Sequence, residues 1–197
     1  RRHRVALDRL ARIAGMLGLA GDADQWRQKA NQVRREILTR AWSDKLGSFA
    51  GALDHDELDA SVLLMPELGL VPANDPRFLK SLDVIGRELG RNTFMLRYTD
   101  DDFGAAETSF LACQFWYIDA LTAAGRIGQA RELLDDLLSR RNAFGILSED
   151  IHPDTGELWG NLPQTYSMAG IVNSCVNLSR NWVDAWPRGE DLEPGGT

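Results

Sequence analysis

Seven stretches of this chain repeat apolar residues at helical spacing, and the connections between them alternate between short and long. A period near 3.6 residues predicts amphipathic helices rather than strands. The expected helices run over about residues 3–19, 22–42, 58–69, 76–89, 107–124, 128–141 and 166–182. The chain is therefore expected to be all-α.

The connections set the topology. Those at about 20–21, 71–75 and 125–126 are short, whereas those at 43–57, 90–106 and 142–165 are long. Alternate connections lie at opposite ends of an array of antiparallel helices, so the three long ones should gather at one end. The third, fifth and seventh helices are the more apolar and should form an inner layer. Short strands are expected within 48–53 and 94–98.

Composition excludes several classes of protein. The formal net charge of −7 argues against a nucleic-acid partner, and no apolar run reaches the roughly 18 residues of a membrane span. Cys113 and Cys175 each lie in an apolar run and read as reduced core residues, which suits a cytoplasmic protein. His55 and His152 lack metal-ligand spacing, so neither a metal site nor a cofactor is expected.

The two ends of the chain differ. It begins at Arg1, without a methionine and inside an expected helix, so we expect the native N-terminus to lie further upstream. The last residues, 187–197, are rich in Pro, Gly and Glu, and we expect a disordered tail there. Residues 1–186 are then expected to belong to one domain.

The long connections are rich in acids. The first carries four acids within 54–59, and the second carries Arg97 and the acids 100–102 and leads to Glu107. The third, which opens with Glu149, also contains Trp159. Long loops without regular structure usually carry function. Carboxylates that move protons, beside an aromatic ring that covers a pyranose face, are what a sugar-cleaving site requires.

Each candidate also has an ordinary structural interpretation. Glu149 is a catalytic base or a helix-capping or surface acid, and Arg97 is a sugar ligand or half of a structural ion pair. Glu107 caps the fifth helix or faces a pocket that holds substrate. Trp159 lines such a pocket or pins its own loop. The chain as a whole is an enzyme part or a helical-hairpin interaction module without chemistry.

Several motifs together resemble glycoside hydrolase family 15, the glucoamylase and bacterial trehalase group. They occur in the family's order along nearly the whole chain. They are 5–9 (VALDR), 56–61 (DELDAS) with 63–66 (LLMP), Arg97-Tyr98 with Asp100-Asp101, Glu107 followed by Phe110-Leu111, Cys113, Phe115-Trp116 and 119–121 (DAL), then 124–126 (AGR), 145–149 (GILSE), and 155–157 (TGE) with 160–164 (GNLPQ) and Tyr166-Ser167.

The resemblance implies the C-terminal part of an (α/α)6 toroid, with the active site at one end. It implies an inverting hydrolase of maltooligosaccharides, starch-like glucans or trehalose, with Glu149 as general base. Arg97 with Asp100 or Asp101 would bind glucose hydroxyls. The family's general acid lies upstream of the matched motifs. This chain alone is therefore expected to be inactive, and its expected partner is the N-terminal half of the same domain.

Overall fold

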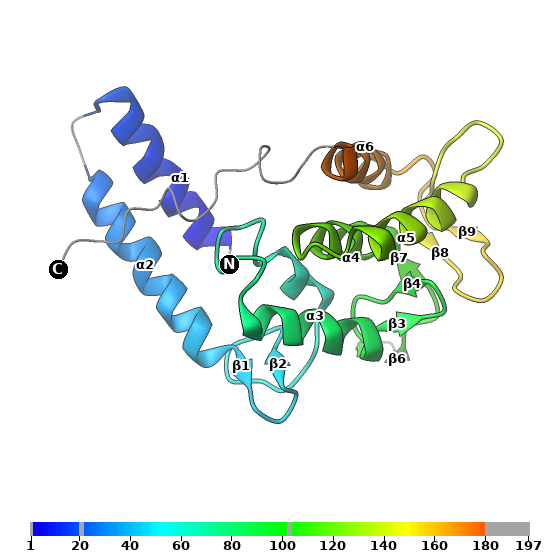
Figure 1. The fold of residues 1–197 in the computed structure, drawn as a ribbon, viewed down its shortest axis with the longest axis horizontal. Helices are drawn as coiled ribbons and strands as arrows, with labels where there is room; N and C mark the ends of the chain where they lie inside the picture. Colours follow the sequence, from blue (N-terminus) through cyan, green and yellow to red (C-terminus); the bar gives the residue numbers. More distant parts are fainter. Residues whose placement is uncertain (1, 20–21, 102–103, 180–197) are drawn as a thin grey trace.

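A computed structural model describes residues 2–19, 22–101 and 104–179 of the chain. Helices dominate it, in antiparallel hairpins, and the all-α prediction is confirmed (Figure 1). The helices are α1 (Arg2–Leu17), α2 (Ala23–Arg40), α3 (Pro76–Glu88), α4 (Leu111–Ala123), α5 (Ile127–Ser139) and α6 (Thr165–Ser179), with a 3-10 helix, η1 (Ala60–Leu64). The predicted tail, 187–197, and the end of the predicted domain, 180–186, lie outside the described residues.

Helix α4 is the centre of the molecule. It packs against α5, α6 and η1, whereas α1 and α2 form a separate hairpin at the left of the view (Figure 1). Its side chains face the core on almost every side, and Leu111, Ile118 and Leu121 have no exposed surface. A helix that is apolar all round is expected to be enclosed by other elements, and α4 confirms this expectation for the fifth predicted helix.

Two aspartates begin the elements that follow them. Asp75 Oδ1 accepts hydrogen bonds from the backbone N–H groups of Arg77 at 2.8 Å and Phe78 at 3.4 Å, and Pro76 opens α3. Proline suits this position because the first N–H groups of a helix have no partner within it. Asp59 Oδ1 likewise accepts the N–H of Ser61 at 2.7 Å at the start of η1.

Three predictions about the helices were wrong. The expected third helix, 58–69, is only η1 followed by turns, because Pro66 cannot donate a helical hydrogen bond. The expected fifth helix begins at Leu111 rather than Glu107 because Ser109 and Phe110 pair as a strand. Cys175 is exposed on α6, whereas Cys113 is buried as predicted, and burial raises the pKa of its thiol to about 12.

The long connections contain nine two-residue strands among the described residues. They are β1 (Trp42–Ser43), β2 (Ser48–Phe49), β3 (Gly90–Arg91), β4 (Phe94–Met95), β5 (Asp100–Asp101), β6 (Gly104–Ala105), β7 (Ser109–Phe110), β8 (Asp150–Ile151) and β9 (Leu158–Trp159). The first six form hairpins in consecutive pairs, and β7-β8-β9 form an antiparallel sheet. The strands expected within 48–53 and 94–98 are confirmed as β2 and β4.

Helix α6 is covered on one side only. Its buried residues are Ser167 and Ser174, and Tyr166, Val172 and Val176 are exposed. Across the described ranges, the chain contains no helix with both the length and the apolar character needed to cross a membrane.

Candidate active site

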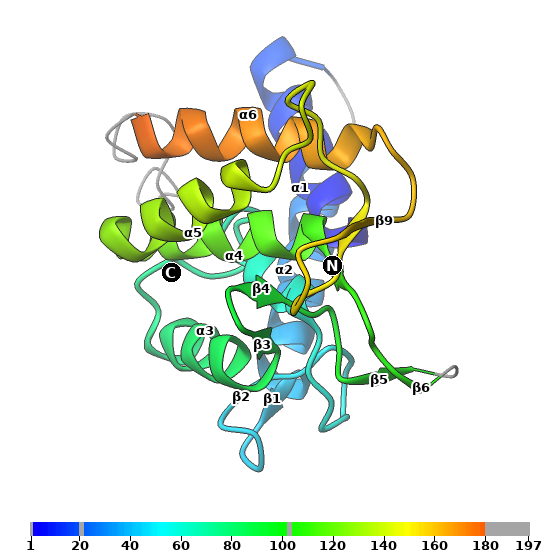
Figure 2. The same cartoon turned by 90° about the vertical axis from the view of Figure 1, so that its right-hand side faces the viewer.

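The second and third long connections meet in front of the first turn of α4 (Figure 2). Strand β7 pairs with β8, with Phe110 opposite Asp150, and Leu111 N donates to Glu149 O at 3.0 Å. The β3–β4 turn also contacts the third connection, where Asn92 Nδ2 donates to Asp154 Oδ1 at 2.9 Å. Segments about 60 residues apart in the sequence therefore lie together at one end of the helical array. This end, formed by the second and third long connections, is called the rim.

The first long connection contributes less than the sequence suggested. Asp54 pairs with Arg40 at the end of α2, and Asp56 accepts the hydroxyl of Ser43 at 2.5 Å. Asp56 thus stabilises its own loop, and Asp54 joins the loop to the end of α2. Only the end of the connection joins the rim, where Ala60 N donates to the backbone oxygen of Arg97 at 2.9 Å.

Glu149 lies immediately before β8 and is half-buried. Its backbone N–H donates to Asn161 O at 2.9 Å. Its Oε2 accepts Asn161 Nδ2 at 2.7 Å and the Asn161 backbone N–H at 3.4 Å. Hydrogen bonds to an ionised acceptor are stronger than those between neutral groups, so Asn161 fixes the carboxylate.

Gly160 lets the chain pass close to this carboxylate. Its φ is +75°, and an added Cβ would lie 3.0 Å from Glu149 Cβ and 3.2 Å from Oε2. Only glycine adopts such a conformation without steric cost. Neither Gly160 nor Asn161 was singled out from the sequence as a partner of Glu149, although both lie within the matched 155–167 motif.

Charges from all three connections surround the first half of α4. Arg97 lowers the pKa of the buried Cys113 thiol, and Asp59 and Asp150 raise it, although burial dominates the net upward shift. Burial and then the charge of Glu149 raise the pKa of Asp150 itself, against a hydrogen bond from Thr108. Two neighbouring carboxylates therefore stand at the start of β8 in different environments.

Arg97 is 45% exposed at its side chain and pairs with Asp59, at 3.6 Å between Nε and Oδ2. Its guanidinium also lies 5.8 Å from the centroid of the Tyr98 ring. Within the described residues the acid that orients Arg97 is Asp59 rather than Asp100, which is exposed on β5. Asp101 pairs through its backbone with Gly104.

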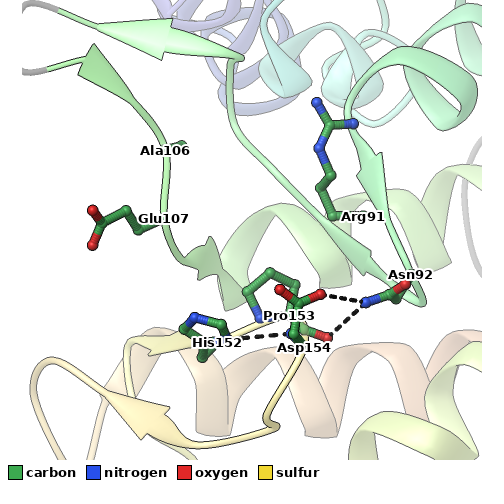
Figure 3. Close-up of a pocket in the computed structure, with 7 residues that line it drawn as sticks. All are labelled: Arg91, Asn92, Ala106, Glu107, His152, Pro153 and Asp154. Carbon is green, nitrogen blue, oxygen red and sulfur yellow. Dashed lines mark hydrogen bonds between the residues drawn. The ribbon is translucent and has the colours of Figure 1, made fainter.

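Glu107 does not cap α4, since Phe110 stands at that position. It lines a pocket of about 350 Å³ on the same rim (Figure 3). The other lining residues are Arg91, Asn92, Ala106, His152, Pro153 and Asp154. Trp159 is 43% exposed, and its ring centroid lies 6.2 Å from that of His152.

Four of the six predicted site residues fall into two groups, and Asp100 and Asp101 stand apart on β5. Glu149 and Arg97 lie near the start of α4, whereas Glu107 and Trp159 lie at or beside the pocket. Within the described part of the chain, no group of three or more His, Cys, Asp or Glu residues could hold a metal ion.

The sequence profile described as "Glycosyl hydrolases family 15" matches residues 2–176, which include the whole rim. The chain belongs to this family. Among curated relatives, the chain is 36% identical over 180 residues to a protein named "Trehalase" from Mycolicibacterium smegmatis. It is 35% identical over 175 residues to another of that name from Thermoplasma volcanium. The alignments cover 89% and 88% of this chain but only 27% and 28% of the relatives.

The fold agrees with this assignment. A solved structure described as "Glycosidase Wild Type" superposes with a TM-score of 0.71 at 21% sequence identity. The superposition covers 83% of this chain and 46% of the glycosidase. The antiparallel hairpins of this family 15 chain therefore form part of a helical glycosidase toroid.

Proposed function

We propose that this chain supplies the general base of an inverting α-glucoside hydrolase. Trehalose is the substrate that should be tested first. The observation that carries the proposal is the fixed carboxylate of Glu149 on a rim shared by two long connections. Trehalose comes first because the curated relatives are named trehalases. Maltooligosaccharides and starch-like glucans are the second substrate class.

In the proposed reaction, Glu149 removes a proton from water while the water oxygen attacks the anomeric carbon. The bond from that carbon to the glycosidic oxygen breaks, and a general acid protonates the leaving oxygen. Asn161 donates to Oε2, which leaves Oε1 to accept the proton from water. Bond formation on the opposite face inverts the anomeric configuration.

Arg97 is proposed to bind hydroxyl groups of the glucose unit. A planar guanidinium can donate two parallel hydrogen bonds to neighbouring oxygens. Asp59 limits its orientation from one side, and the partial exposure of Arg97 leaves donors accessible. Asp100 and Asp101 are proposed to contribute acceptors from the β5–β6 hairpin next to it.

The general acid is proposed to belong to the part of the family's catalytic domain that this chain does not match. An inverting pair of carboxyl groups stands about 6.5–9.5 Å apart, with room for a water molecule. The 197-residue chain assayed alone is therefore expected to release no glucose from trehalose or maltose.

The deciding experiment replaces Glu149 with Gln in the native-length protein. We expect kcat to fall by about 10²–10⁴ because a general base is removed, with the folded state retained. The control is Glu157→Gln, which changes an exposed acid of the same connection. Unchanged turnover of the Glu149 variant on both substrate classes would reject the proposed role. The interaction module without chemistry would then be the better interpretation.

A further inference from the structure

The pocket that contains Glu107 has features that the proposed hydrolysis does not use. Two hairpins form part of its wall, beside the segment that carries Ala106 and Glu107, and they are joined directly, because Asn92 Nδ2 donates to Pro153 O at 3.1 Å and to Asp154 Oδ1 at 2.9 Å (Figure 3). Asn92 stands in the β3–β4 turn with φ +54°. The walls are thus held together without a ligand.

His152 has a defined hydrogen-bonding role in this pocket. Its Nδ1 accepts the backbone N–H groups of Asp154 at 3.2 Å and Thr155 at 3.3 Å. A ring nitrogen that accepts carries no proton, so in the neutral imidazole the proton is on Nε2. His152 therefore offers one N–H donor, and its ring lies beside the ring of the partly exposed Trp159.

The remaining groups add donors and acceptors of both kinds. Glu107 is exposed and forms no ion pair within the described residues, so its carboxylate is available as an acceptor. Arg91 is exposed and donates from one terminal nitrogen to Glu88 O and Gly90 O, which leaves its other N–H groups for a ligand. The charged lining is one cation, Arg91, against two anions, Glu107 and Asp154.

This combination selects the chemistry of a ligand. A surplus of negative charge disfavours phosphate or carboxylate ligands, whereas mixed donors and acceptors beside an indole suit a neutral polyhydroxylated ring. The volume of about 350 Å³ lies in the range of small-molecule sites. We propose that the pocket is an accessory site for a neutral sugar unit.

The accessory site is distinct from the position of the proposed base. Glu149 precedes β8 and His152 follows it, and three residues of extended chain span about 10 Å. Glu149 is not among the residues that line the pocket. We therefore expect a sugar bound there to lie beside the Glu149 carboxylate and not on it. The site deepens the proposed function, on which its role in substrate capture depends.

The test uses the histidine signals of the 197-residue chain, which has three histidines in all. The chain is titrated with trehalose, maltose, glucose and, separately, inorganic phosphate, and the imidazole resonances are followed by NMR. His152→Ala identifies its signal. We expect the sugars to shift the His152 signal and leave that of His55 unmoved, and phosphate to shift neither. No sugar-dependent shift, or a shift with phosphate alone, would overturn the proposal.

Matched variants locate the bound sugar. Arg91→Ala and Glu107→Gln should each weaken it by about 2–10-fold, the value of one hydrogen bond, whereas Arg87→Ala on α3 should not change it. Loss of the shift in Arg97→Ala instead would place the sugar at Arg97, which does not line the pocket, and would reject the accessory site. Glu149→Gln should keep the shift, so failure of the base assignment and failure of this site give different results.

Discussion

Asn161 and Glu149 hold one another through both backbone and side chain. Glu149 N donates to Asn161 O at 2.9 Å, and Asn161 Nδ2 donates to Glu149 Oε2 at 2.7 Å. The pair closes the open end of the β8–β9 hairpin. The position of the proposed base therefore depends on a residue twelve positions away.

Removal of the Asn161 side chain tests whether this contact positions the base. We expect Asn161→Ala to lower kcat of the native-length protein by about 10–100-fold, since small displacements of a catalytic group are costly, with a smaller change in KM. Steady-state kinetics on trehalose measures the split. The nearby Asn142→Ala, which removes a side-chain acceptor within its own turn, is the control and should affect stability rather than kcat. Equal kcat in wild type and Asn161→Ala would contradict the positioning role.

Gly160→Ala should disturb Glu149 directly. The new Cβ would stand 3.0 Å from Glu149 Cβ, in a conformation with φ +75°, and backbone strain of this kind costs on the order of 1–3 kcal/mol. Gly145→Ala is a matched control, because its φ is +76° and an added Cβ meets nothing within 4 Å. Urea unfolding should show similar losses of stability for both variants, and only Gly160→Ala should lose activity. Equal activity of the two would show that the close approach is unimportant.

Arg97 and Asp59 should act as a unit in sugar binding. Arg97→Lys keeps the charge but loses the planar fork, and we expect kcat/KM to fall by about 10-fold or more, as for 1–2 hydrogen bonds lost. Asp59→Ala should lower kcat/KM through the same arginine and also destabilise η1, whose Ser61 N–H it caps. The double variant should lose less than the sum of the singles. Additive losses of kcat/KM would show that Arg97 and Asp59 act independently.

Two half-buried aspartates should affect stability with opposite dependence on pH. Burial raises the pKa of Asp119, against hydrogen bonds from Ser174 and Asn177. A carboxyl whose pKa is higher in the folded state stabilises that state at low pH, and this contribution is lost as pH rises through the folded value. Asp119→Asn keeps an acceptor for α6, so its stability relative to wild type should improve from acidic to neutral pH.

Asp136 is the matched comparison. Although burial opposes it, hydrogen bonds from Thr93 and Arg140 lower the pKa of this carboxyl. Its contribution is present above the unfolded pKa and disappears as pH falls through the folded one. Asp136→Asn should therefore be most destabilising at neutral pH. Urea unfolding between acidic and neutral pH measures both trends, and the same sign for both variants would refute the assignment.

Much of the fold could be predicted from local patterns. Asp75 and Pro76 mark the start of α3 because capping depends on neighbouring residues. The all-round apolar character of residues 111–121 predicted the enclosed α4. The end of η1 was missed because an apolar run looks helical even where Pro66 and the left-handed Gly69 stop it.

The candidate site was predictable in its residues more than in its contacts. The order and spacing of the motifs pointed to Glu149 and Arg97, and the family match supports that resemblance. The sequence could not show that Asp59 rather than Asp100 pairs with Arg97. It also could not show that Asp54 pairs with Arg40 of α2 and that Asp56 pairs with Ser43 of its own loop.

The sequence by itself determined most of the helices and the family, because each of these depends on residue order and spacing. Tertiary structure alone decided which side chains meet. Asn161 meets Glu149 and Asn92 meets Asp154 only in the folded arrangement of the β3–β4 hairpin and the β7-β8-β9 sheet. Hydrogen bonds act over about 3 Å, whereas these partners are separated by 12 and 62 positions along the chain.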